Sequence, residues 1–170
     1  GVYVGLSYVL MAFLQNVSIS ERYGFSACVA NIVTFLMLAG LWLWDALYPR
    51  SDLDRRDMPG WRYLALPLAL VAFWFPVNPI DLTPDFNPIH LVASGSGLSF
   101  CMTTPLYLAV LIVYHRRVNE AVFLVTGCIG VMLGIGNLVL EFVMYPALWW
   151  IGVLHLPLLA TSLYCVWTTV

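Results

Sequence analysis

Residues 122–141 read VFLVTGCIGVMLGIGNLVLE, twenty residues in which Glu141 is the one charged side chain. A run of about 20 apolar residues is long enough for an α-helix to cross the hydrocarbon core of a bilayer. A charged side chain at the centre of such a helix costs about 3 kcal/mol on insertion scales, so membrane helices rarely carry one without a function. The segment therefore predicts a membrane span and marks Glu141 as a candidate functional residue.

The composition of the whole chain agrees with a membrane protein. Hydrophobic residues make up 62% of the 170 residues and charged residues 9%, whereas soluble domains carry roughly 25% charged residues. This length predicts a single transmembrane helical domain over residues 1–170. All seven basic residues are arginines, which excludes chemistry on a lysine amine and gives no electrostatic footprint for a nucleic-acid partner. The four cysteines lie in apolar segments without a CxxC motif and are interpreted as small buried hydrophobic residues.

The apolar segments predict an all-α, polytopic helix bundle with about six transmembrane helices. The predicted spans are residues 1–19, 25–48, 61–77, 89–114, 120–143 and 148–170. The first is the least regular because Gln15 and Asn16 interrupt it, and the bundle has five spans if this segment does not cross.

The arginines orient the predicted spans. Two connections hold all but one of them: Arg50, Arg55, Arg56 and Arg62 before the third span, and Arg116 and Arg117 before the fifth. The positive-inside rule places both connections in the cytoplasm, which puts both termini there as well. The sequence therefore predicts a multi-pass integral membrane protein with the lipid bilayer as a partner. Asp45, close to Arg50 in sequence, is expected to form an interfacial ion pair on the inner side.

The connection over residues 75–90 lies on the predicted outer side and is rich in proline. Thr83-Pro84 and Asn87-Pro88 each resemble a helix N-cap followed by proline at the first helical position. This pattern predicts a short helical turn near Pro84 and the start of the next membrane helix at Pro88. The connection contains no basic residue and contributes three candidate site residues: Asp81, Asp85 and His90.

The fifth predicted span carries one stripe of small and polar residues. The stripe consists of Gly127, Gly130, Gly134, Asn137 and Glu141, spaced 3, 4, 3 and 4 residues apart. At 3.6 residues per turn these positions share one helical face, and its glycines permit close packing against another helix. Asn137 and Glu141 are therefore expected to point into the bundle rather than toward lipid.

His155 in the sixth span completes the candidate set, roughly 12 Å below the outer end of its helix at 1.5 Å per residue. The ligand- or ion-binding candidates in the outer half of the bundle are Asp81, Asp85, His90, Asn137, Glu141 and His155. Five of them also have a purely structural interpretation: the aspartates as loop caps, the histidines as hydrogen-bonding or interfacial residues, and Glu141 as a side chain that extends to the interface.

Three classes of function fit this set. The preferred class is the binding or transport of an ion, a proton or a small ligand at an outward-facing acidic site. The second is an intramembrane enzyme that acts on a lipid or isoprenoid by acid–base or metal chemistry. His90, His155 and Asp85 are then metal-ligand candidates, although no HExxH motif supports them. The third is a non-catalytic subunit of a larger membrane complex. A homo-oligomer is compatible with all three classes, and the sequence leaves the cofactor unknown.

Overall fold

The computed structural model describes residues 1–20, 24–49, 59–78, 80–93, 95–114 and 118–169. These residues are mostly helical, as predicted. The α-helices are α1 (Val2–Leu14), α2 (Val29–Leu47), α3 (Ala65–Trp74), α4 (His90–Ala93), α5 (Phe100–Val113), α6 (Glu120–Val139) and α7 (Trp149–Thr169). Short 3-10 turns cover Gly60–Leu64, Gly95–Leu98 and Pro146–Leu148, and a π-helical turn covers Leu140–Met144. An antiparallel hairpin of β1 (Val17–Ser20) and β2 (Gly24–Ala27) was not expected from the sequence.

Three helical segments in the described part of the chain are long and apolar enough to cross a membrane: Val29–Leu47, Glu120–Met144 and Pro146–Thr169. They correspond to the second, fifth and sixth predicted spans. Their length and composition support a membrane protein with a helical bundle. The number of six spans stays a prediction, because the other helical segments are short or broken.

The first predicted span is replaced by a shorter helix and a hairpin. Helix α1 has 13 residues, which at 1.5 Å per residue is roughly 20 Å, less than the hydrocarbon thickness of about 30 Å. The amides that interrupt this segment have structural roles at the end of α1. The Gln15 side-chain oxygen accepts a hydrogen bond from the Phe100 backbone N–H (3.1 Å), and the Asn16 side chain donates to the Met11 carbonyl (3.0 Å).

The fourth predicted span is broken where it was expected to be continuous. Helix α4 with the 3-10 turn Gly95–Leu98 forms one piece and helix α5 the other, at 98° to each other. The break coincides with a run of serine and glycine, residues that favour turns and caps over helix interiors. Thr103 Oγ1 donates a hydrogen bond to the Ser96 carbonyl (2.7 Å). In a continuous helix this carbonyl would accept from a backbone N–H instead.

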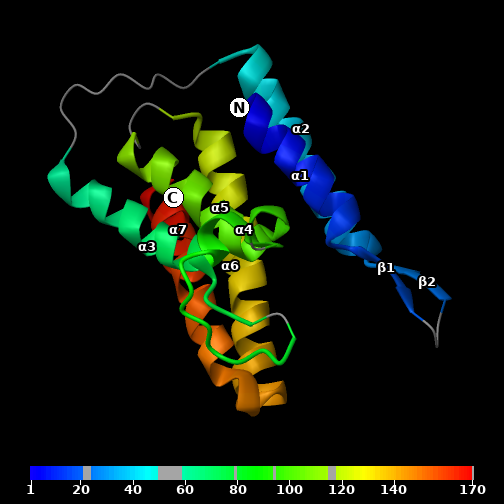
Figure 1. Ribbon diagram of the computed structural model, residues 1–170. Coiled ribbons are helices and arrows are strands. Elements are labelled where there is room, and N and C mark those ends of the chain that lie inside the picture. The colour runs from blue at the N-terminus through cyan, green and yellow to red at the C-terminus, as the bar shows by residue number, and fades with distance from the viewer. Residues whose placement is uncertain (21–23, 50–58, 79, 94, 115–117, 170) are drawn as a thin grey trace.

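The helices form a main bundle and an arm (Figure 1). Helices α3, α5, α6 and α7 pack together, while α1 and α2 lie against each other and lean away at the hairpin end. The stacked rings of Phe35 and Phe100 (4.9 Å between centroids) and the hydrogen bond from Trp42 Nε1 to Thr126 Oγ1 (3.1 Å) join the arm to α5 and α6. Both termini lie at one end of the molecule, and the hairpin, the 75–90 connection and the α6–α7 turn lie toward the other.

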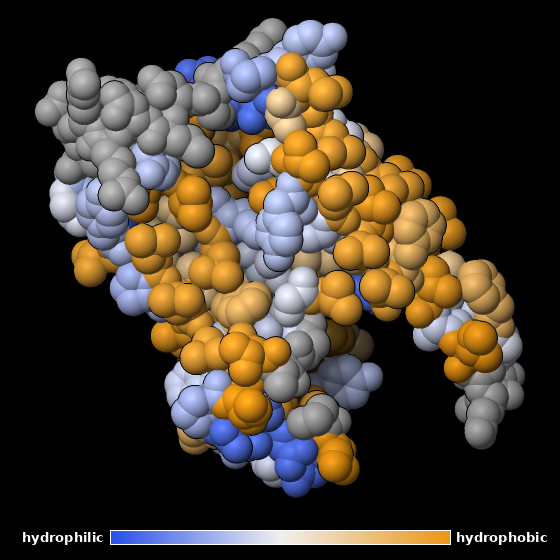
Figure 2. All heavy atoms as spheres, turned by 45° about the horizontal axis from the view of Figure 1, so that its top comes forward, coloured by the Kyte–Doolittle hydropathy of each residue, from blue (hydrophilic) through white to orange (hydrophobic). Residues whose placement is uncertain are grey.

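Apolar side chains cover the outer surface of the helices, as lipid-facing positions require. Figure 2 shows them along the α1–α2 arm, whereas the most hydrophilic side chains gather near the ends of the molecule. Met37 on α2 and Met132 on α6 are both 65% exposed. In water such a surface would be unfavourable, but lipid tails solvate it.

Helices α6 and α7 approach each other closely along the glycine stripe. A Cβ atom at Gly127 would lie 2.9 Å from Cys165 Cβ and 3.2 Å from the Ser162 carbonyl oxygen. At Gly134 it would lie 3.4 Å from Leu159 Cβ. The stripe therefore packs against the backbone of α7 and fixes how the two helices are placed relative to each other.

Replacing Gly127 with alanine is expected to lower the free energy of unfolding by about 1–3 kcal/mol, because neither Cys165 Cβ nor the Ser162 backbone can rotate away. Gly136→Ala is the matched control on the same helix, since no atom lies within 4 Å of a Cβ at that position. Thermal unfolding of both variants in detergent measures the difference. Equal midpoints for Gly127→Ala and Gly136→Ala would contradict the close packing.

Candidate functional site

Glu141 lies where α6 changes its helical geometry. The π-helical turn Leu140–Met144 follows α6 directly, and the Tyr145 N–H donates to the Leu140 carbonyl (2.8 Å), five residues earlier. Such turns are rare and occur frequently at functional sites. Glu141 is 9% exposed, so its carboxylate is inside the protein rather than in lipid or water. The sequence pattern predicted which helical face carries Glu141, but it did not predict the π-helical turn.

His155 faces Glu141 from α7. Its Nδ1 lies 3.0 Å from Glu141 Oε2 and 3.1 Å from the Ile151 carbonyl oxygen one turn earlier. His155 is 5% exposed. It is six residues into α7, roughly 9 Å from the start of the helix at 1.5 Å per residue. Two of the predicted site residues are thus in direct contact across the α6–α7 interface.

The neighbours of His155 Nδ1 determine its tautomer. A carbonyl oxygen is an acceptor, and so is an ionised carboxylate, so Nδ1 carries the hydrogen when Glu141 is ionised. That hydrogen is directed to Ile151, and Glu141 Oε2 has no aligned hydrogen-bond partner among the described residues. In the neutral ring Nε2 is then an unprotonated acceptor. A proton bound at Nε2 would give an imidazolium beside the Glu141 carboxylate.

Asn137 lies one turn before Glu141 on the same face and contacts α5. Its side-chain N–H groups donate to the Leu133 carbonyl (2.9 Å) and to Cys101 Sγ (3.2 Å). Cys101 was missed as a neighbour of the site, because a cysteine in an apolar segment indicates only a small hydrophobic residue. That interpretation fits Cys101 and Cys165, which are buried, but not Cys28 and Cys128, which are exposed.

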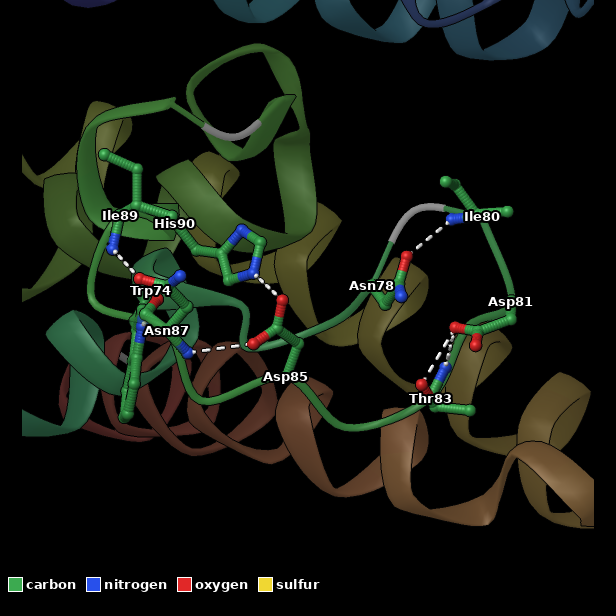
Figure 3. Close-up of polar contacts among 9 residues, drawn as sticks. All are labelled: Trp74, Asn78, Ile80, Asp81, Thr83, Asp85, Asn87, Ile89 and His90. Atoms are coloured by element: carbon green, nitrogen blue, oxygen red, sulfur yellow. Dashed lines mark hydrogen bonds and ion pairs between the residues drawn. The ribbon is translucent and has the colours of Figure 1, made fainter.

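The 75–90 connection is a series of side-chain-capped turns rather than a helix (Figure 3). Four side chains accept a hydrogen bond from the backbone N–H two residues later, at 3.0 or 3.1 Å: Asn78, Asp81, Asp85 and Asn87. The prediction of a helical turn near Pro84 is wrong, because Pro84 pairs with Val77 in an antiparallel bridge. The expected cap at Asn87 is present, and it precedes α4.

Asp85 and His90 form a second carboxylate–histidine pair in this connection. His90 Nε2 lies 2.8 Å from Asp85 Oδ2, and the side chain of Asp85 is 41% exposed against 13% for His90. The hydrogen bond from His90, followed by that from the Asn87 N–H, holds the pKa of Asp85 below its usual range. Asp81 instead turns toward Thr83, away from this pair (Figure 3), and the Thr83 hydroxyl and N–H lower its pKa.

The six predicted residues therefore separate into a helix group and a loop group. The helix group is Asn137, which is half-buried, with the buried Glu141 and His155, and the loop group is Asp81, Asp85 and His90. Val77 packs against Ile151 and Leu154, so the connection rests on the first turns of α7, next to His155 in sequence. Within the residues that the structure describes, no three His, Cys, Asp or Glu side chains come together as a metal site requires.

A buried polar contact at the other end of the bundle was not predicted. Asn119 caps the start of α6 by accepting from the Ala121 N–H (3.1 Å), and its side chain donates to Asp45 Oδ1 (2.7 Å). Asp45 is 8% exposed, and this hydrogen bond holds it against the start of α6. Its expected partner Arg50 lies outside the described residues, as do the other arginines of the orientation argument apart from Arg62. An asparagine before Glu120 is an N-cap signal from which Asn119 could have been found.

The chain was compared with protein-family models, with curated proteins and with solved structures, and it matches none of them. The chemistry of the site therefore has to be argued from its own residues. Two observations stand out: a buried carboxylate–imidazole contact between two membrane helices, and a capped acidic connection that packs on one of them.

Replacing His90 with alanine is expected to raise the pKa of Asp85 toward its ordinary value of about 3.9, because the largest stabilising contact of the carboxylate is lost. A lowered folded pKa stabilises the loop above the unfolded value, and this contribution disappears as the pH falls through the folded pKa. In His90→Ala the folded pKa lies closer to the unfolded value, so this contribution is smaller and its loss is complete at a higher pH than in wild type. Carboxyl-carbon NMR of the aspartates measures the titration.

Thr83→Val is the control for that titration, because it should raise the pKa of Asp81 and leave that of Asp85 in place. If Asp85 titrates at the same pH in wild type and His90→Ala, the contact between His90 and Asp85 is contradicted.

Proposed function

We propose that this chain is a multi-pass membrane protein that binds and releases a proton at Glu141 and His155, and so takes part in the binding or transport of an ion or small polar ligand. The contact of 3.0 Å between the two side chains across the α6–α7 interface is the observation that carries the proposal. Ionisable residues inside membrane bundles commonly mark proton relays and ion pathways.

The pair has a suitable acceptor for a proton. With Nδ1 of His155 directed to the Ile151 carbonyl, the free lone pair of the neutral ring is on Nε2. Protonation there places a positive charge beside the Glu141 carboxylate, so the two charges compensate each other inside the bundle. Alternatively the carboxylate itself takes up the proton. In either case protonation changes the net charge of the buried site from negative to neutral, so a cation bound at the deprotonated site would be released when the proton binds.

The surroundings favour exchange from the end of the bundle that carries the 75–90 connection. Two aspartates with lowered pKa, Asp81 and Asp85, keep this connection negative at neutral pH and attract cations. Val77 of the same connection contacts Ile151 and Leu154, the helix turn next to His155. The arginine distribution of the sequence predicts that this end faces outward.

Replacing Glu141 with glutamine is expected to abolish pH-driven proton flux in proteoliposomes, because the amide keeps the size of the side chain but cannot bind or compensate a proton. A pH-sensitive dye inside the vesicles reports the flux after a pH jump. His155→Gln should reduce the flux as well, since it removes the ring nitrogen.

The matched control is Glu120→Gln, which removes a carboxylate from the exposed first turn of the same helix. It should transport as wild type does. Flux in Glu141→Gln equal to that of Glu120→Gln would overturn the proposal. A different set of results would favour a non-catalytic subunit instead. In that case wild type shows no flux, Glu141→Gln folds normally, and partner chains co-purify.

A further inference from the structure

Arg62 is a buried arginine in which one side-chain donor lacks a partner among the described residues. It lies in the turn Gly60–Leu64 before α3 and is 9% exposed. Its Nε is fully buried and makes no hydrogen bond within the described residues. Its guanidinium lies over the Trp61 ring, whose centroid is 5.8 Å from Cζ. Arginine presents five N–H donors, and a carboxylate or phosphate is the acceptor that matches them.

Arg62 lines a cavity of about 180 Å³ between α3, α5 and α7. Its walls include Ala65 from α3, Ile112 from α5 and Ala160 from α7, and Arg62 is the one charged residue among the described residues that line it. A water molecule takes up about 30 Å³ in the liquid, so the cavity has room for a tetrahedral anion but not for a whole lipid.

An exposed apolar stripe continues from the cavity along α3. Leu64 and Leu68 line the cavity, and Val71 follows at the next helical turn on the same face. They are 69%, 39% and 49% exposed, so the stripe is open on the outside of the bundle. An acyl chain that begins at the cavity can therefore lie along α3. A free phosphate ion would leave this stripe uncovered.

We propose that this cavity binds the phosphate of an anionic phospholipid through Arg62, with one acyl chain along Leu64, Leu68 and Val71. The phosphate supplies the acceptor that Arg62 Nε lacks among the described residues, and the lipid supplies the apolar cover. Basic pockets between membrane helices on the cytoplasmic side are typical lipid headgroup sites, and Arg62 is in the connection predicted to be cytoplasmic.

The test is lipid binding to the purified full chain in detergent. Native mass spectrometry counts bound phosphatidylglycerol during a titration, and thermal unfolding follows its effect on stability. Wild type is expected to retain one phosphatidylglycerol and to gain stability from it, more than from phosphatidylcholine. Arg62→Gln should bind phosphatidylglycerol about tenfold more weakly, as expected for the loss of one charged hydrogen-bonding group.

Two variants separate a lost site from general loss of charge. Arg55→Gln removes the same charge from the neighbouring segment outside the described residues and should bind phosphatidylglycerol as wild type does. Arg62→Lys keeps the charge but not the planar set of donors and should fall between wild type and Arg62→Gln. Without lipid, Arg62→Gln should unfold at or above the wild-type temperature, since it removes a buried charge whose Nε has no partner among the described residues.

Four results would overturn the proposal. These are equal phosphatidylglycerol binding by Arg62→Gln and wild type, equal binding of phosphatidylcholine and phosphatidylglycerol, and equal stabilisation by inorganic phosphate alone. The fourth is a lower unfolding temperature of Arg62→Gln without lipid, which would indicate that Arg62 has a partner inside the protein.

Discussion

Three glycines on α6 let its backbone approach α7, and the position of every polar group at the proposed site follows from that approach. Gly127 and Gly134 have Cys165 and Leu159 of α7 directly opposite. Glu141 is two turns beyond Gly134 on the same face, so it meets His155 rather than lipid. A bulkier α6 would move the two helices apart and separate the carboxylate from the imidazole. Close packing thus gives the helix pair its stability in lipid, and it also brings two ionisable groups together.

The backbone around Glu141 and His155 departs from regular α-helix, and side-chain hydrogen bonds hold part of it in place. The π-helical turn interrupts regular α-helix at Glu141, and α5 begins only after a sharp bend. The 75–90 connection is held by its own side-chain caps and by the Trp74 Nε1 hydrogen bond to the Asn87 carbonyl (3.1 Å). Irregular backbone at membrane depth is tolerated where protein or a cavity surrounds it, because its polar groups then find partners. The 75–90 connection lies toward the same end of the molecule as the turn between α6 and α7 (Figure 1).

The sequence predicted the parts of this arrangement that depend on periodicity and composition. The spacing of Gly127 through Glu141 predicted a shared face, and the apolar runs predicted α2, α6 and α7. It did not predict the hairpin at 17–27 or the break before α5, because local backbone hydrogen bonds compete with helix extension there. The sequence also offered Asp81, Asp85 and His90 as neighbours of Glu141. The loop uses these residues for its own turns, and only the folded chain distinguishes such caps from ligands.

A double-mutant cycle on Glu141 and His155 tests the central contact most directly. The free energy of unfolding would be measured for wild type, Glu141→Gln, His155→Gln and the double variant in the same detergent. Side chains in contact inside a helix pair should be coupled by about 0.5–3 kcal/mol, so the double variant should differ from the sum of the single ones. Additive effects within about 0.3 kcal/mol would contradict the contact, and with it the proposed proton site.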